Sequence, residues 1–314
     1  MSQALLFPGQ GSQFVGMGKD LCDRYPAARE VFARADAALD LPLTRLIFEG
    51  PEETLRETRN AQPALLTHSL AVWAAMEVRW DPRELLAAGH SLGEYSAYTV
   101  ANALAFEDAV RVVRRRGELM FEAGQRAPGT MAAVMGADAD AVRAACARVP
   151  GVVRPANLNS PGQIVISGEV EAVRAAGELL KAGGAKRVIE LNVSGAFHSP
   201  LMEPAVEGLR AALAAIEVRD ATFPVYANAT AEPVTAAADI RASLVRQLLS
   251  PVLWEPTLRA LVALKPEGFW EIGPGQVLRG LLRQTDREAA CSSLGTADEV
   301  EEFRASAGGD RVAG

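Results

Sequence analysis

GHSLG at residues 89–93 stands between a short apolar run, residues 84–88, and a helical pattern that continues to residue 103. A strand that turns at once into a helix crowds the backbone, so glycines are expected where side chains would clash. The turn directs the Ser91 hydroxyl outward above the start of the helix, where a developing negative charge is favoured. The sequence therefore predicts a nucleophile elbow, with Ser91 as the nucleophile.

Strand and helix patterns alternate on both sides of this turn. Residues 4–7 are apolar and are stopped by Pro8-Gly9, which predicts a short buried strand. Helical patterns cover residues 26–39, 61–79, 106–124 and 201–216, and further strand-like runs cover residues 224–227 and 269–272. Strands that alternate with helices predict an α/β fold with a mostly parallel sheet, covered by helices on both faces.

Residues 130–193 have a different pattern, in which two strands follow each other without a helix between them. Strands are predicted at residues 131–135, 152–156, 163–167 and 187–191, with helices at 139–148 and 171–182. The order βαββαβ is that of a ferredoxin-like unit. We therefore expect a ferredoxin-like subdomain at residues 128–195, inserted into a larger catalytic domain formed by residues 1–127 and 196–314.

Composition excludes several classes of protein. The 314 residues carry a formal charge of −7, which disfavours a general nucleic-acid binder. Cys22, Cys146 and Cys291 lie far apart and form no CxxC pair, so we expect reduced thiols and no metal site. The first residues lack the basic start of a signal peptide, and polar residues interrupt the uncharged segment 60–76. These features predict a cytoplasmic protein without a membrane span.

A serine nucleophile needs a base, and the chain has three histidines. His90 adjoins Ser91, so its side chain should point away from the serine hydroxyl. His68 lies inside the apolar helical pattern of residues 61–79, where a hydrogen-bonded core or edge histidine is expected. His198 lies in a loop between the predicted subdomain and the next helix, and such loops favour catalytic groups. Elimination therefore favours His198 as the base.

The run Arg114-Arg115-Arg116 would ordinarily form a solvated helix face. However, Arg116 shares one helical stripe with apolar residues, namely Ala109, Val112, Val113 and Met120. An arginine on an apolar stripe requires a partner. The sequence leaves two alternatives open, an internal carboxylate or an anionic substrate.

At this point the sequence resembles the malonyl-CoA:acyl carrier protein transacylase family along nearly its whole length. The matching segments, in chain order, are FPGQGSQ at 7–13, GHSLGEYSA at 89–97, RRRGELM at 114–120, GAFHS at 195–199, NATAEPV at 228–234, QLLSPVLW at 247–254 and EIGPGQVLRGLL at 271–282. The resemblance implies an α/β-hydrolase-like core that holds a ferredoxin-like insert. It also implies Ser91 as nucleophile, His198 as general base and acid, and an oxyanion hole made by the backbone amides of Gln10 and Leu92.

The resemblance further assigns Arg116 to the malonyl carboxylate and Gln247 to a position beside the catalytic histidine. Phe197, next to His198, is expected to narrow the space beside the acyl α-carbon and to disfavour methylmalonyl. Malonyl-CoA and the acidic, phosphopantetheine-bearing holo acyl carrier protein are then the expected partners. No metal or other cofactor, no nucleic acid and no membrane is expected, and we expect a monomer that serves fatty-acid synthesis.

Three alternatives compete with this interpretation. A discrete acyltransferase of a polyketide synthase would use the same residues. A serine esterase or thioesterase would share the nucleophile, base and oxyanion hole, but it has no use for a cation on an apolar stripe. A non-catalytic scaffold is disfavoured by the presence of Ser91, His198 and Arg116 together.

Overall fold

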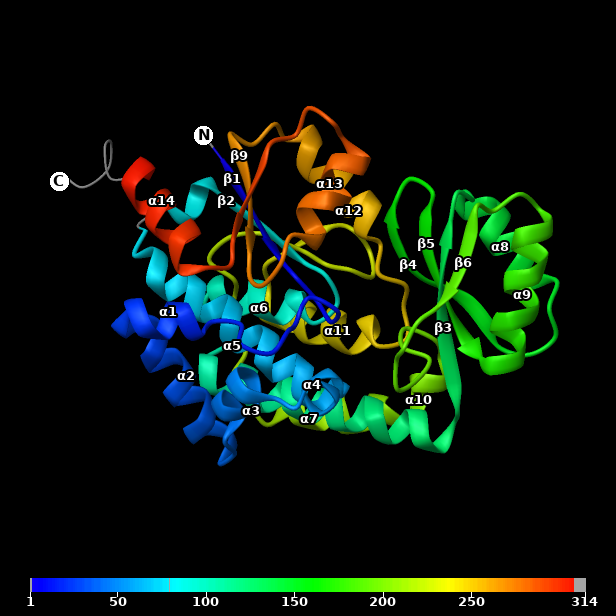
Figure 1. Ribbon diagram of the computed structural model, residues 1–314, viewed down its shortest axis with the longest axis horizontal. Helices are drawn as coiled ribbons and strands as arrows, with labels where there is room; N and C mark the ends of the chain where they lie inside the picture. The colour runs from blue at the N-terminus through cyan, green and yellow to red at the C-terminus, as the bar shows by residue number, and fades with distance from the viewer. Residues whose placement is uncertain (1, 79, 308–314) are drawn as a thin grey trace.

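A six-stranded sheet in the order β10-β9-β1-β2-β7-β8 forms the centre of the larger part of the molecule (Figure 1). The computed structural model describes residues 2–78 and 80–307. The strands are β1 (Gln3–Phe7), β2 (Leu85–Gly89), β7 (Val225–Tyr226), β8 (Pro233–Val234), β9 (Gly268–Ile272) and β10 (Cys291–Leu294). The first five strands in this order pair in parallel, and β8 alone pairs antiparallel to its neighbour β7. The mostly parallel sheet predicted from the alternating pattern is confirmed.

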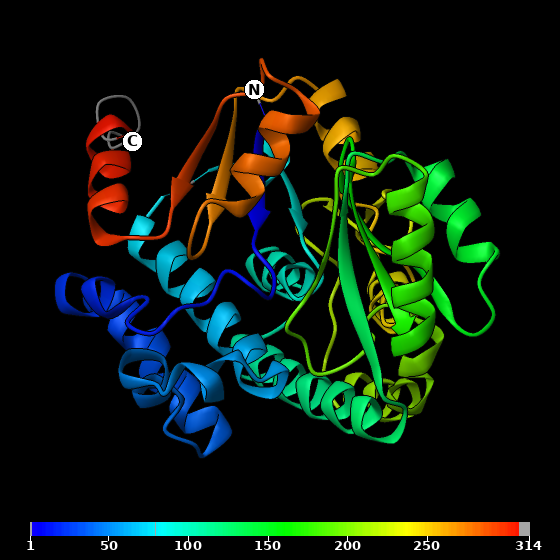
Figure 2. The same ribbon diagram turned by 45° about the vertical axis from the view of Figure 1, so that its right-hand side comes forward.

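Helices bury both faces of this sheet, because successive strand residues point to opposite sides. Leu5 and Phe7 of β1 pack in the main core with α2, α5 and α7, whereas Ala4 and Leu6 pack with α12 and α13. Figures 1 and 2 show these two groups of helices on opposite sides of the strands. The helices of this part are α1 (Lys19–Arg24), α2 (Pro26–Leu39), α3 (Leu43–Glu49), α4 (Glu52–Arg56), α5 (Thr58–Met76), α6 (Gly93–Val100), α7 (Phe106–Arg126), α10 (Glu203–Ala214), α11 (Ala237–Gln247), α12 (Trp254–Ala263), α13 (Val277–Thr285) and α14 (Ala297–Ala307).

A second, four-stranded sheet has the order β4-β5-β3-β6, and all its pairings are antiparallel. Its strands are β3 (Gly129–Met135), β4 (Val153–Ser160), β5 (Gln163–Glu169) and β6 (Arg187–Glu190), and its helices are α8 (Ala139–Ala147) and α9 (Val170–Ala182). Both helices contribute to a separate small core with this sheet. The order βαββαβ and the central positions of β3 and β5 confirm the ferredoxin-like insert.

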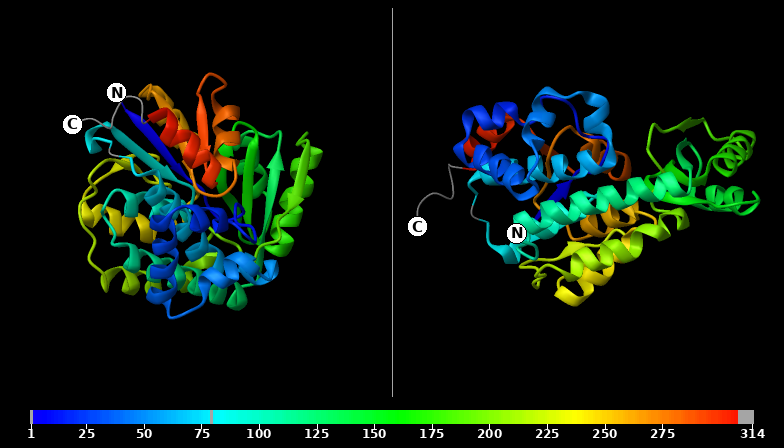
Figure 3. Two further views of the ribbon diagram at one scale, coloured as in Figure 1. Left: turned by 60° about the vertical axis from the view of Figure 1, so that its left-hand side comes forward. Right: turned by 90° about the horizontal axis from the view of Figure 1, so that it is seen from below.

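The long helix α7 leads directly from the larger part into β3, as the right-hand view in Figure 3, seen from below, shows. The insert also contacts the larger part through β4, since Leu158 N–H donates to Val252 O at 2.9 Å and Val252 N–H donates to Ala156 O at 2.8 Å. No helix among residues 2–78 and 80–307 is long and apolar enough to cross a membrane.

Helix boundaries differ from the predicted ones in two places near the site. The pattern at 201–216 becomes a 3₁₀ turn, Pro200–Met202, followed by α10. Pro204 has no N–H to donate and is suited to the first turn of an α-helix, so α10 begins at Glu203. The helix after Ser91 begins at Gly93 and ends at Val100, three residues before the predicted end.

Candidate active site

Ser91 lies on the turn between β2 and α6 with a backbone φ of +50°, in the left-handed region that non-glycine residues rarely adopt. The glycines on each side make this turn possible. A Cβ atom at Gly89 would lie 1.9 Å from the Gly93 carbonyl carbon, and one at Gly93 would lie 2.1 Å from Phe7 O. The close approach of three backbone segments therefore requires glycine at both positions.

The Ser91 hydroxyl and the His198 ring are joined by a hydrogen bond of 2.8 Å between Oγ and Nε2. The other ring nitrogen, Nδ1, lies 3.0 Å from the backbone carbonyl oxygen of Gln247. A carbonyl can only accept, so Nδ1 carries the proton and Nε2 accepts from Ser91. Burial first, and then the charge of Arg116, lowers the pKa of His198 to about 3, which keeps Nε2 unprotonated at neutral pH.

The other two histidines lie in different surroundings. His90 Nε2 contacts Asn159 Oδ1 at 2.9 Å, and its ring packs edge-on against Trp254. His68 is fully buried in α5, and burial lowers its pKa to about 4. Neither ring nitrogen forms a hydrogen bond of good geometry with another described residue, although a backbone group of Gly295 is close enough to oppose the lowering of the pKa. The expected position in the core is confirmed, and the hydrogen bonding of His68 stays a prediction.

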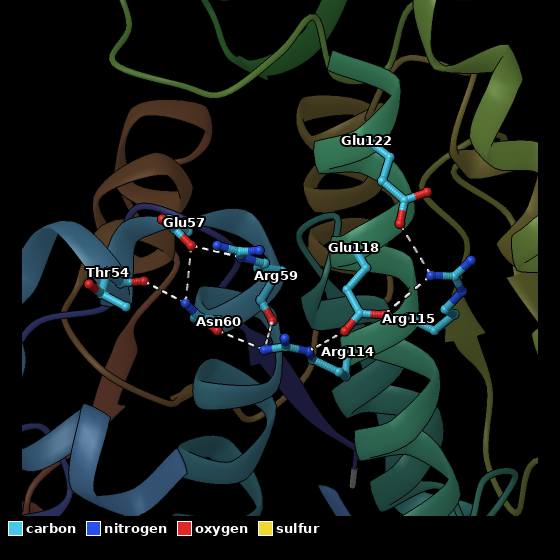
Figure 4. Close-up of polar contacts among 8 residues, drawn as sticks. All are labelled: Thr54, Glu57, Arg59, Asn60, Arg114, Arg115, Glu118 and Glu122. Atoms are coloured by element: carbon cyan, nitrogen blue, oxygen red, sulfur yellow. Dashed lines mark hydrogen bonds and ion pairs between the residues drawn. The ribbon is translucent and has the colours of Figure 1, made fainter. Parts of the chain in front are cut away.

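The three consecutive arginines of α7 separate by helical geometry. Arg114 donates to Glu118 at 2.6 Å and to Asn60 Oδ1 at 2.7 Å, and Arg115 pairs with Glu118 and Glu122 (Figure 4). Arg114 thus lies between α7 and α5, and Arg115 lies on the exposed side of α7. Arg114 and Arg115 thus have carboxylate partners of their own.

Arg116 points inward, and only 1% of it is exposed. Its Nη1 donates to Gln62 Oε1 at 2.6 Å, and its Nη2 donates to Gln247 Oε1 at 2.9 Å and to Ser91 Oγ at 3.1 Å. Its guanidinium lies 5.4 Å from the centre of the Tyr95 ring. Within the described residues, Arg116 forms no direct ion pair with a carboxylate, but the buried Glu94 carboxylate, which binds the same Gln247 side chain, is close enough to favour the charged guanidinium. Burial lowers the pKa of Arg116, an effect that a bound anion would oppose.

Gln10 and Leu92 occupy equivalent positions beyond two adjacent parallel strands. Phe7 pairs with Gly89 in the register of β1 and β2, and each of the two residues follows its strand partner by three positions. The carboxyl ends of parallel strands meet at one sheet edge, where polar backbone groups converge. In the described part of the chain, the backbone N–H groups of Gln10 and Leu92 donate to no other residue. Their role as an oxyanion hole stays a prediction.

Two polar residues beside Ser91 were not identified from the sequence. Gln62 of α5 binds Arg116, and Asn228, which follows β7, accepts from Ser91 N–H at 2.6 Å through Oδ1. Asn228 also donates from Nδ2 to Gly89 O at 2.7 Å. Gln62 could have been found as an amide within the charge-free segment 60–76, and Asn228 as the first residue of NATAEPV. Phe197 is buried in the main core next to His198.

The parallel-sheet fold and the serine–histidine pair define the class of protein, an enzyme equipped to pass an acyl group through a serine ester. The sequence profile described as the acyl transferase domain matches residues 4–307. The chain belongs to this acyl transferase family and, within it, to the malonyl-CoA:acyl carrier protein transacylases.

Three relatives illustrate the similarity. The malonyl CoA-acyl carrier protein transacylase of Bacillus subtilis is 48% identical over 301 residues, covering 95% of each chain. The crystal structure of an acyl-carrier-protein S-malonyltransferase from Bartonella henselae superposes with a TM-score of 0.94 at 40% identity, over 98% of this chain and 100% of that one. A malonyl-transacylase solved in complex with its type II polyketide synthase acyl-carrier protein gives a TM-score of 0.92 at 40% identity, over 96% and 99% of the two chains.

Proposed function

We propose that this enzyme transfers a malonyl group from malonyl-CoA to the phosphopantetheine thiol of acyl carrier protein, through a malonyl ester on Ser91, and thereby supplies extender units for fatty-acid synthesis. The observation that carries the proposal is the position of Arg116. A buried guanidinium without a carboxylate partner among the described residues donates to the same Oγ atom that binds His198. An acyl group attached at that oxygen would meet this cation, and malonyl carries the matching carboxylate.

In the first half of the reaction, Ser91 Oγ attacks the thioester carbonyl carbon while His198 Nε2 accepts the hydroxyl proton. The negative charge that forms on the carbonyl oxygen is stabilised by the N–H groups of Gln10 and Leu92. When the intermediate collapses, the carbon–sulfur bond breaks and the thiolate of CoA takes the proton from His198. The products are free CoA and a malonyl-serine ester.

The second half repeats these steps with a different thiol. His198 Nε2 accepts the proton of the phosphopantetheine thiol, and the sulfur attacks the ester carbonyl. The carbon–oxygen bond to Ser91 breaks, and His198 returns the proton to the serine oxygen. The Gln247 carbonyl keeps the ring in one tautomer through both halves, because it holds the proton on Nδ1. The side chains return to their starting state without a metal or other cofactor.

Arg116 also separates this proposal from an ordinary serine esterase. Gln62 and Gln247 present neutral amide oxygens to the guanidinium, and Glu94 is linked to it only through Gln247. A buried charge without a direct counter-ion is costly, and a substrate carboxylate lowers that cost. An esterase for neutral acyl groups would gain nothing from this arrangement.

One observation supports the polyketide alternative. The relative that was solved with a type II polyketide synthase acyl-carrier protein is 40% identical to this chain, as is the enzyme from Bartonella henselae. Both assignments share the residues of the site. The rates of malonyl transfer to carrier proteins of the two pathways would distinguish them, with the fatty-acid carrier favoured under our proposal.

The proposal includes the organisation of the chain. We propose a catalytic domain of residues 1–127 and 196–314 with a subdomain at 128–195, acting as a cytoplasmic monomer. The separate core of the small sheet supports this division. Residues 308–314 lie outside the described part of the chain.

Intact-mass measurement tests the central step. Malonyl-CoA should add one malonyl group to the protein, and holo acyl carrier protein should then remove it and become malonylated. A protein that gains no malonyl group, or that loses it only to water, would contradict the proposal.

A further inference from the structure

Glu94 is a buried carboxylate that the reaction described above does not use. It lies in the first turn of α6, three residues after Ser91, and is fully shielded from solvent. One oxygen, Oε2, accepts two hydrogen bonds, from the backbone N–H of Asn228 at 2.9 Å and from Gln247 Nε2 at 2.8 Å. Each of these two partners in turn contacts the reacting groups.

The first connection leads through Asn228 to the backbone of the nucleophile. The Asn228 side chain joins both sides of the turn, since Oδ1 accepts from Ser91 N–H and Nδ2 donates to Gly89 O. Ser91 has a strained, left-handed backbone, which persists only where surrounding contacts hold it. Glu94 fixes the backbone of the residue that provides these contacts.

The second connection leads through Gln247 to the other side chains of the site. Gln247 Nε2 donates to Glu94 Oε2 and to Ser91 O at 3.0 Å, so the amide nitrogen faces two acceptors. The amide oxygen is thereby directed to Arg116 Nη2, which can only donate. A flipped amide would place N–H groups against the guanidinium and a carbonyl against the Glu94 carboxylate. Glu94 therefore selects the amide orientation that binds Arg116.

We propose that Glu94 is a positioning residue of this acyltransferase, whose Oε2 atom holds Ser91 through Asn228 and orients Arg116 through Gln247. The inference rests on the proposed function for the identity of the acyl group, but the positioning of Ser91 concerns any acyl group. The position requires a side chain of the length of glutamate that carries an oxygen able to accept hydrogen bonds. Burial raises the pKa of Glu94 to about 7, and a proton on Oε1 leaves Oε2 able to accept both bonds.

Two substitutions of similar size distinguish the effect of the acceptor oxygen of Glu94 from the effect of its side-chain volume. Glu94→Gln retains an oxygen and removes the charge, whereas Glu94→Met retains the length and removes both oxygens. Should Glu94→Met fail to fold, Glu94→Ala provides the same comparison without an acceptor.

Glu271 provides a matched control. It is also fully buried, burial raises its pKa to about 7, and it accepts two backbone N–H groups, those of Leu278 and Arg279. These bonds cap α13 and do not lead to Ser91 or His198. Glu271→Gln and Glu271→Met should therefore reproduce the loss of stability without the loss of reactivity.

The test measures the rate at which a small neutral phosphonofluoridate labels the serine, kcat for malonyl and for acetyl transfer, and thermal unfolding. Glu94→Met should label about 10- to 100-fold more slowly and lose kcat for both acyl groups by a similar factor, since a displacement near 1 Å has such effects. Glu94→Gln should stay within about threefold of the wild type, and folded Glu271 variants should react normally.

Labelling of folded Glu94→Met at the wild-type rate would overturn the proposal. Equal losses in Glu94→Gln and Glu94→Met would also overturn it, because the acceptor would then not matter. The labelling reaction uses no malonyl group, so its outcome does not depend on the proposed function. The rates of malonyl and acetyl transfer by the wild type, measured in the same series, test the proposed function separately.

Discussion

Replacement of Arg116 by alanine should change which acyl group the enzyme accepts. The guanidinium is 1% exposed and has no carboxylate partner among the described residues, so a malonyl carboxylate would complete a buried ion pair. Removing one member of such a pair costs about 3–5 kcal/mol. At about 1.36 kcal/mol for each factor of ten, malonyl kcat/KM should fall about 10²- to 10⁴-fold.

Acetyl transfer should respond differently, because acetyl has no carboxylate. Arg116→Ala removes one donor to Ser91 Oγ, and a single hydrogen bond contributes about 1 kcal/mol. Acetyl kcat/KM should therefore change by less than about tenfold. The Oε1 atoms of Gln62 and Gln247 also lose a donor, so rates should be normalised to folded protein.

The assay is competition between malonyl-CoA and acetyl-CoA for wild type and variant, with acylated carrier protein resolved by mass. Arg114→Ala is the matched control, since Arg114 is the same residue type on the same helix and pairs with Glu118 outside the site. Its malonyl-to-acetyl ratio should equal that of the wild type. If Arg116→Ala lowers malonyl and acetyl transfer by the same factor, Arg116 is structural and the carboxylate-binding argument is wrong.

Four further predictions concern the nucleophile, the base and the acyl pocket. Ser91→Ala should form no malonyl adduct by intact mass while keeping its circular dichroism spectrum; an adduct in this variant would exclude Ser91. His198→Ala should transfer malonyl about 10²- to 10⁴-fold more slowly in a steady-state assay. His68→Ala should change mainly the unfolding temperature, and a comparable rate loss in folded His68→Ala would contradict the assignment of the base. The pKa of His198 lies at about 3 instead of near 6.5, so the ring stays neutral and able to accept a proton as the pH falls. The rate of acylation of the free enzyme, measured in a stopped assay, should therefore be the same at pH 7.5 and at pH 5.5. A decline in this rate centred near pH 6.5 would refute the lowered pKa. Phe197→Ala should raise methylmalonyl relative to malonyl transfer in a competition assay, and an unchanged ratio would show that Phe197 does not limit the pocket.

Parts of the site followed from short-range rules. The positions of Gly89 and Gly93 around Ser91 predict the turn from the motif alone, although the atom that a Cβ at Gly93 would meet is Phe7 O, on a distant part of the chain. The apolar stripe of α7 predicts an inward Arg116, because helical periodicity is a local property. Elimination among three histidines left His198, which the structure places against Ser91 at 2.8 Å.

Other parts required contacts between distant segments. Asn228 and Gln62 lie 137 and 29 positions from Ser91 in the chain, and no local pattern connects them with it. The helix α14 packs Phe303 against Trp80 and Trp270, an aromatic cluster assembled from three separate regions. Such groups meet only when the sheet order brings their segments together.

By itself, the sequence determined the α/β class, the ferredoxin-like insert and the nucleophile turn, because strand and helix periodicity and the Gly-x-Ser-x-Gly motif are properties of a few neighbouring residues. Only the tertiary structure decided the partners of Arg116. The sequence permitted either an internal carboxylate or an anionic ligand, and the fold surrounds the guanidinium with two amide oxygens and the serine hydroxyl. That choice depends on how α5, α7 and α11 pack around the end of β2, where charge and geometry are set by residues far apart in the chain.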